Sequence, residues 1–151
     1  NKPGVLVRIA LVFARRGFNI DSLVVSPSVD PRYSRMTITA QGDLETLDQI
    51  VKQSGKLVDV IHSSEHTPEN AIEKELAFFK VRVKTSAKSS LQKLMLQFRA
   101  TTVDKTKDSL IAEITTTTEK LDEFEKLLKK FGIIEMVRTG KLVMMRGKET
   151  T

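Results

Sequence analysis

Two short motifs near the start of the chain could bind the charged ends of a free amino acid. Asn1-Lys2-Pro3-Gly4-Val5-Leu6 places a proline and a glycine just before an apolar, periodic segment. A helix that begins there presents unpaired backbone N–H groups and the positive end of its dipole, which favour a carboxylate. Asn19 and Ile20 follow the glycine that ends this helix. The Asn19 amide can accept a hydrogen bond from an ammonium group, and Ile20 can cover an aliphatic side chain. Together the motifs predict a site for a small zwitterion, without a catalytic group.

Simpler interpretations exist for the same residues. Gly4 and Gly17 could only mark helix ends, and Asn19 could satisfy its own backbone in a turn. His62 and His66 are four residues apart but lack a second ligand cluster, so no metal ligand is predicted. No Ser-His-Asp arrangement is apparent, and no catalytic residue is predicted.

The elements that must position the two motifs can be predicted from periodicity. Apolar residues at helical spacing predict a helix over 4–16, ended by Gly17, and a second helix that Gly42-Asp43 caps and Gly55 ends. Branched residues or alternation predict strands at 20–26, 35–41 and 57–61.

A polar segment with a proline separates this half from the next. We therefore expect an N-terminal domain over residues 1–65, a linker over 66–75 and a C-terminal domain over 76–151. In the second half, alternation predicts strands at 76–83, 101–105, 109–115 and 133–137, with a further strand at 142–145. The two intervening helices have the apolar faces Leu91, Leu94, Met95 and Phe98, and Leu121, Phe124, Leu127 and Leu128.

The two halves repeat one pattern at an offset of about 77 residues. The offset superimposes a helix stripe, its terminating glycine and the following strand: Leu44, Leu47, Ile50, Val51, Gly55, Leu57 and Val60 fall on Leu121, Phe124, Leu127, Leu128, Gly132, Ile134 and Val137. The fold class predicted is therefore α+β, with two ferredoxin-like βαββαβ domains, the first without its opening strand in this sequence. The second copy has neither ligand motif, so ligand binding is assigned to the first.

Composition and charge restrict the function further. The chain has no cysteine, and no apolar run reaches the roughly 18 residues that a membrane helix needs. The net charge of +6 lies in the second half, but its lysines alternate with glutamates as in residues 119–126, so we expect neither nucleic-acid nor membrane binding. We expect a cytoplasmic, bacterial-type location, or an organelle if a leader precedes residue 1.

The motifs resemble those of a known family. Residues 1–65 are similar to the ACT domain of the small, regulatory subunit of acetohydroxyacid synthase, also called acetolactate synthase. The matching N-terminal stretches are Asn1-x-Pro3-Gly4-Val5-Leu6-x-Arg8-Ile9, Phe13 to Leu23, Ser34 to Ile38 and Lys56 to Val60. Glu73-Lys74-Glu75-Leu76, Phe98-Arg99 and Val137-Arg138-Thr139-Gly140 fit the C-terminal domain of that family.

The resemblance implies a function that periodicity cannot show. Such a subunit is not an enzyme and holds no cofactor of its own. It activates a catalytic subunit that carries thiamine diphosphate, FAD and magnesium, and confers feedback inhibition by valine, leucine or isoleucine. The ACT domains form a homodimer, with the effector at their interface. The effector-binding residues implied are Asn1, Pro3, Gly4, Val5, Leu6, Asn19, Ile20 and Gln49, with Asn19 and Ile20 from the partner protomer.

Two alternatives stay open at this point. An ACT-type sensor could instead regulate transcription or another enzyme, which DNA binding by the basic second half would favour. An enzyme on a ferredoxin-like fold is disfavoured because no cluster of acid–base or nucleophilic residues is apparent.

Overall fold

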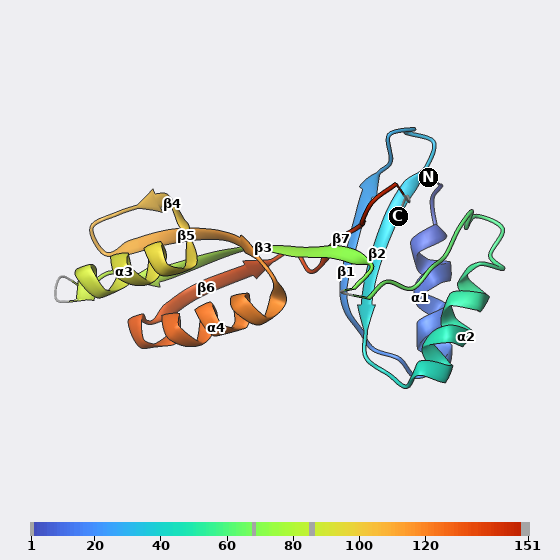
Figure 1. Cartoon of the computed structure of the whole chain (residues 1–151), viewed down its shortest axis with the longest axis horizontal. Coiled ribbons are helices and arrows are strands. Elements are labelled where there is room, and N and C mark those ends of the chain that lie inside the picture. Colours follow the sequence, from blue (N-terminus) through green and yellow to red (C-terminus); the bar gives the residue numbers. More distant parts are fainter. Residues whose placement is uncertain (1, 68, 85–86, 149–151) are drawn as a thin grey trace. The chain divides into compact units, whose positions relative to one another are not determined.

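The computed structural model describes residues 2–67, 69–84 and 87–148. The chain divides into an N-terminal unit, Asn1–Ile72 with Val143–Thr151, and a C-terminal unit, Glu73–Leu142 (Figure 1). Both are mixed α and β structures, and the fold class predicted from the sequence is confirmed.

The N-terminal unit places two helices on one face of a two-stranded antiparallel sheet (Figure 1). Its elements are α1 (Val5–Arg15), β1 (Ile20–Pro27), β2 (Ser34–Ala40) and α2 (Leu44–Ser54). The end of α1 requires glycine, because Gly17 has a φ of +72° and turns the chain so that the Phe18 N–H donates to the Phe13 carbonyl (3.1 Å). The start of α2 is capped as predicted, since the Asp43 carboxylate accepts from the Thr46 N–H (2.8 Å).

The core of this unit is small. Its hydrophobic cluster has three buried members among the described residues, Ile9, Phe13 and Ile50, with partly buried neighbours such as Met36 and Ile38 on β2. Such a core leaves much of the apolar surface of the unit in contact with water.

The strand predicted at residues 57–61 is wrong. These residues form turns, in which the Val60 N–H donates to the Leu57 carbonyl (2.9 Å). In a βαββαβ unit the last strand pairs with the first, as β6 (Ile133–Arg138) does with β3 (Ala71–Arg82) in the C-terminal unit. Among the described residues no strand precedes α1 or pairs with residues 57–61, and their backbone groups bond locally.

The C-terminal unit has the complete pattern. Besides β3 and β6 it contains α3 (Lys88–Phe98), β4 (Thr101–Lys105), β5 (Ser109–Thr116), α4 (Thr118–Leu128) and a 3₁₀ turn, η2 (Lys129–Phe131). The antiparallel strand order is β4-β5-β3-β6, and the short strand β7 (Leu142–Met145) also pairs with β3. The predicted hairpin, both helices and both later strands are confirmed, but β3 begins at Ala71, inside the segment expected to be a linker, and not at Leu76.

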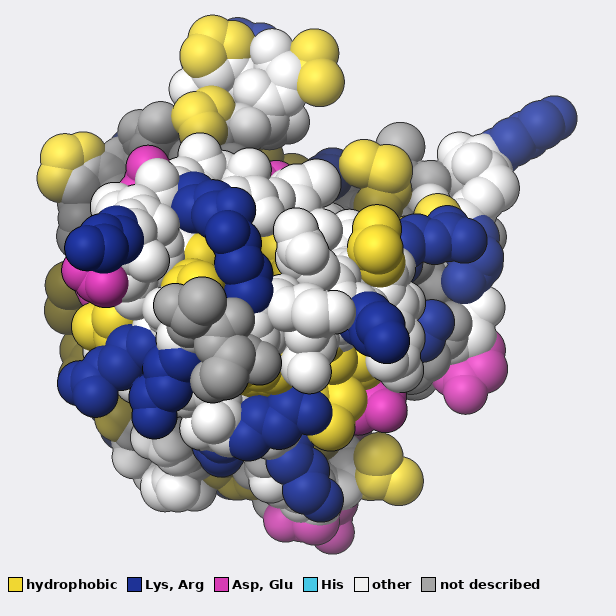
Figure 2. Space-filling model, turned by 90° about the vertical axis from the view of Figure 1, so that its left-hand side faces the viewer, with side chains coloured by type: hydrophobic (Ala, Val, Ile, Leu, Met, Phe, Trp, Pro, Cys, Tyr) yellow, Lys and Arg dark blue, Asp and Glu magenta, His cyan; other side chains and the backbone are white. Residues whose placement is uncertain are grey.

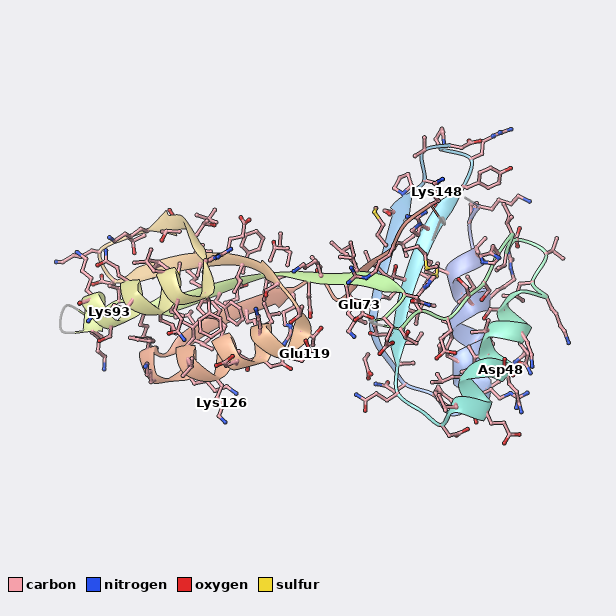
Figure 3. The ribbon with its side chains drawn as sticks, viewed as in Figure 1. Asp48, Glu73, Lys93, Glu119, Lys126 and Lys148 are labelled. Carbon is pink, nitrogen blue, oxygen red and sulfur yellow. The ribbon has the colours of Figure 1, made fainter. Side chains whose placement is uncertain are left out.

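Alternation along β3 determines which face carries the core of this unit. Ala77, Phe79 and Val81 are fully buried beneath α3 and α4, and the Phe79 ring meets Phe124 of α4 edge to face at 5.5 Å. Figure 3 shows the side chains that fill this layer, while the labelled Lys93 on α3 and Lys126 on α4 point away from it. Within the described part of the unit, no helix covers the opposite face of the sheet.

Candidate functional site

The first predicted motif forms the start of α1. Gly4 is the residue that caps the helix, with a φ of +79°, and its carbonyl accepts the first helical bond from the Arg8 N–H (3.2 Å). No side chain caps this end, so the N–H groups of the first turn face outward without an intrahelical partner. Pro3, Val5 and Leu6 adjoin it as predicted, whereas Asn1 lies outside the described residues.

Charged side chains surround this helix start. The Asp59 carboxylate, only 14% exposed, accepts from Arg8 and forms an ion pair with Lys2 (3.4 Å). Burial works against ionisation of Asp59, but the hydrogen bonds and charges of Arg8 and Lys2 outweigh it and hold the pKa of Asp59 below its ordinary value. Asp59 therefore neutralises part of the positive charge and ties the turns at 57–60 to α1.

The second motif lies beyond the other end of α1. The Asn19 Nδ2 donates to Asp21 Oδ1 (3.3 Å), which orients the amide and leaves its carbonyl oxygen as an acceptor. Ile20 begins β1 and is half-buried. Gln49 on α2 accepts a hydrogen bond from Arg16, the residue that caps the C-terminus of α1. Gln49 therefore lies at the C-terminal end of α1 and not at its start near Gly4.

The two predicted half-sites do not meet within one protomer. Helix α1 has 11 residues, which at 1.5 Å of rise each separates its ends by about 16 Å. The carboxylate and ammonium of one amino acid are attached to the same carbon, so a single molecule cannot reach both ends of the helix. Pro3, Gly4, Val5 and Leu6 lie at the start of α1, whereas Asn19 and Ile20 follow its other end, where Arg16 binds Gln49.

Sequence reasoning missed an exposed apolar stripe on α1. The stripe lies beside the face that carries Ile9 and Phe13, and each member is three or four residues from another member. It consists of Leu6, Val7, Ala10, Leu11 and Ala14. Val7 is 61% and Leu11 45% exposed. The signal was present in the sequence, because Val5–Arg15 is apolar nearly all round and such a helix is usually covered on both sides.

The described residues contain no group of three or more His, Cys, Asp and Glu side chains that could hold a metal ion. None of the helices they form combines the length and apolar character needed to cross a membrane.

Comparisons with known proteins cover both units. Residues 1–62 match the family described as the AHAS small subunit-like ACT domain, and residues 74–147 match the family described as the small subunit of acetolactate synthase. The chain is 42% identical over 149 residues to a probable acetolactate synthase small subunit of Archaeoglobus fulgidus, covering 99% of this chain and 93% of that protein. It is 44% identical over 151 residues to one of Methanothermobacter thermautotrophicus, covering 99% and 90%.

A solved structure agrees with these sequence matches. The crystal structure of the acetolactate synthase small subunit from Thermotoga maritima superimposes with a TM-score of 0.88 at 40% identity, covering 99% of this chain and 93% of that one.

Proposed function

Because this chain belongs to the family of acetolactate synthase small subunits, we propose that it activates a catalytic subunit of acetohydroxyacid synthase and confers feedback inhibition by a branched-chain amino acid. The catalytic subunit would carry thiamine diphosphate, FAD and magnesium, as the family resemblance implies. The small subunit would supply no reacting group, and its contribution would be to bind the effector and to change the state of its partner.

The main support for an effector site is the geometry of α1. The helix start around Gly4 suits a carboxylate and the Asn19 amide suits an ammonium group, but about 16 Å of helix separates them in one protomer. A second copy with its α1 antiparallel to the first removes this separation. Pairing centred between Ala10 and Leu11 sets residue 2 of one chain opposite Asn19 of the partner subunit, so that the two half-sites combine.

The exposed apolar stripe supports the same pairing. In an antiparallel pair with that centre, Val7 of one protomer lies near Ala14 of the partner subunit, and the two Arg8 positions are offset by five residues, about 7.5 Å along the axis. The stripe is thus self-complementary, as a two-fold contact requires. It would also cover the Leu11 side chain, which the small core of one unit leaves in water.

The size of the effector limits its specificity. Valine has about eight heavy atoms, so micromolar binding already uses most of the ceiling of ~1.5 kcal/mol per atom. One methylene changes binding by about 1–3 kcal/mol, so valine, leucine and isoleucine should differ only modestly in affinity.

Reconstitution tests the proposal. Acetolactate formation is measured with the catalytic subunit of the same organism alone, with this chain, and with this chain under increasing valine, leucine or isoleucine. We expect this chain to raise the rate and one of the amino acids to lower it. Calorimetry of the small subunit with each amino acid shows whether the effector binds to this subunit. If the rate were the same with and without this chain, the proposal would be refuted.

A further inference from the structure

Most of the net charge of the chain is concentrated at one end of the C-terminal unit. Strand pairing brings the end of β3, the β4–β5 turn, the start of β6 and the start of α3 together there: the Val83 N–H donates to the Asp108 carbonyl (2.9 Å), and the Arg82 N–H to the Gly132 carbonyl (3.0 Å). Figure 2 looks onto this end and shows Lys and Arg side chains gathered over it. We call it the basic end; its cations are Arg82, Lys84, Lys88, Lys105, Lys107, Lys129 and Lys130.

These cations have little local compensation. Asp104 and Asp108 are the nearby acidic residues in the β4–β5 hairpin. Lys129 pairs with Glu125 (3.1 Å), but among the described residues the other six cations make no ion pair. All seven side chains are exposed. The basic end therefore presents a positive potential that the protein does not neutralise itself.

One of these cations opposes the stability of its own helix. Lys88 is the first residue of α3, no acidic residue lies in that first turn, and no side chain caps it. A cation next to the positive end of a helix dipole is unfavourable, and an acidic residue there is the stabilising choice. The fold therefore gains nothing from the charge of Lys88, which stays available to a partner.

An apolar hollow adjoins the basic end on the uncovered face of the sheet. Its volume is about 320 Å³, and Phe78, Lys80, Val103, Ile111, Glu135 and Val137 line it. Val103 and Val137 are each 55% exposed. An apolar centre beside a charged rim is the composition of a protein–protein interface. Nucleic acid would favour exposed aromatic rings interleaved with arginines, whereas the cations here are six lysines and one arginine.

We propose that the basic end and the adjoining hollow bind an acidic surface of the catalytic subunit, whose apolar side chain enters the hollow while its carboxylates face the lysines. This inference rests on the proposed function and names the surface through which the small subunit binds its partner. Charged rims mainly govern the association rate and its salt dependence, so complex formation should weaken steeply as salt rises.

Charge reversal in the full-length chain tests the surface. The double variant Lys105→Glu/Lys107→Glu changes the β4–β5 hairpin, and Lys74→Glu/Lys120→Glu is the matched control, because it makes the same charge change at exposed sites away from the basic end. Binding of the purified catalytic subunit is measured by surface plasmon resonance between 50 and 500 mM NaCl. We expect the hairpin variant to bind about tenfold more weakly or worse at low salt, mainly through a slower association rate, and the control to bind as the wild type does.

A single variant separates binding from folding. Lys88→Glu places a favourable charge at the start of α3, so its melting temperature should equal or exceed that of the wild type while binding weakens. Equal binding by the wild type, Lys88→Glu and the hairpin variant would overturn the inference but leave the proposed function intact. If the wild type itself failed to bind the catalytic subunit, both would fail. Preferential binding of a DNA duplex or of anionic vesicles by the wild type, lost in the hairpin variant, would also overturn it.

Discussion

Replacing Glu75 by glutamine should strongly destabilise the C-terminal unit. Glu75 lies on β3 and is 5% exposed, and the hydrogen bonds from Arg138 lower its pKa and favour the ionised carboxylate despite burial. Its two oxygens accept from Nε and Nη2 of Arg138 on β6 (both 2.9 Å), and the Thr118 hydroxyl at the start of α4 donates to it (3.2 Å). The carboxylate thus joins a central strand, an edge strand and a helix. The same Arg138 also donates to the exposed Asp122 (2.7 Å).

The magnitude follows from what each group retains. A hydrogen bond to a charged partner contributes about 1.5–3 kcal/mol, and removing one partner of a fully buried ion pair costs about 3–5 kcal/mol. Glutamine keeps one acceptor, but it turns an NH₂ donor toward the guanidinium. Arg138 is 22% exposed and keeps Asp122, which reduces the penalty. We therefore expect the variant to lose about 2–3 kcal/mol in the free energy of unfolding.

Hydrogen exchange measured by mass spectrometry localises the effect to the right unit. In a series of urea concentrations, the amides of β3 and β5 should show a lower free energy of opening, and those of β1 and β2 should be unchanged. Asp122→Asn is the matched control, since it removes a carboxylate from the same arginine at an exposed site and should cost under about 1 kcal/mol. If Glu75→Gln cost no more than Asp122→Asn, the buried bidentate pair would not be what joins these elements.

Three further predictions concern the pH dependence set by Glu75, the turn at Gly4 and the stripe residue Leu11. Hydrogen bonds from Arg138 lower the pKa of Glu75 although burial opposes this. The stabilisation from Glu75 is therefore complete above the ordinary carboxyl pKa of 4.5 and is lost as pH falls below it. In Glu75→Gln, the free energy of unfolding of the C-terminal unit, measured in urea at a series of pH values, should depend less on pH in the acid range. Gly4→Ala should lose about 1–2 kcal/mol of stability from backbone strain alone, because an added Cβ meets only Arg8 at 3.7 Å. Gly4→Asp should in addition abolish effector binding in calorimetry. Equal effector affinity in both variants would exclude a carboxylate site at this turn. Leu11→Glu should convert the proposed dimer to monomers, as measured by size-exclusion chromatography with light scattering. Leu96→Glu, on the exposed side of α3, is the control and should leave the dimer intact. If Leu11→Glu remained a dimer, the dimer contact would not be the stripe on α1.

Much of the fold was predictable because local signals agreed with tertiary packing. Gly17 and Asp43 mark helix ends by their own conformational and hydrogen-bonding properties, so the bounds of α1 and α2 are correct within a residue or two. The strand at 57–61 failed for the opposite reason. Its branched residues match strand composition, but a strand exists only when a neighbour pairs with it, and composition does not show that neighbour. Gly55 illustrates the same limit: it aligns with Gly132 in the repeat, yet only Gly132 has a positive φ.

The residue types of the candidate site were predictable from the sequence, but the distances and contacts between them were not. Sequence identifies Gly4 and Asn19 as suited to opposite charges, and the structure adds the distance that separates them within one chain. The hydrogen bond between Gln49 and Arg16 and the ion pairs of Asp59 join residues far apart in sequence, where no periodicity operates. The exposed stripe on α1 was visible in principle, but an apolar helix face is normally assigned to the core until burial is known.

A site divided between two chains has a consequence for regulation. An effector that binds only the pair stabilises the pair by mass action, and each of the two equilibria must strengthen the other to the same extent. Apparent effector affinity should therefore fall when the small subunit is diluted below the dissociation constant of the pair, while at high concentration it should become constant. The small core of the N-terminal unit makes this coupling physically reasonable, because Leu11 and its neighbours remain in water unless the second chain covers them. The pairing surface and the effector site are then parts of one equilibrium, and a change in the stripe should alter feedback without touching the effector.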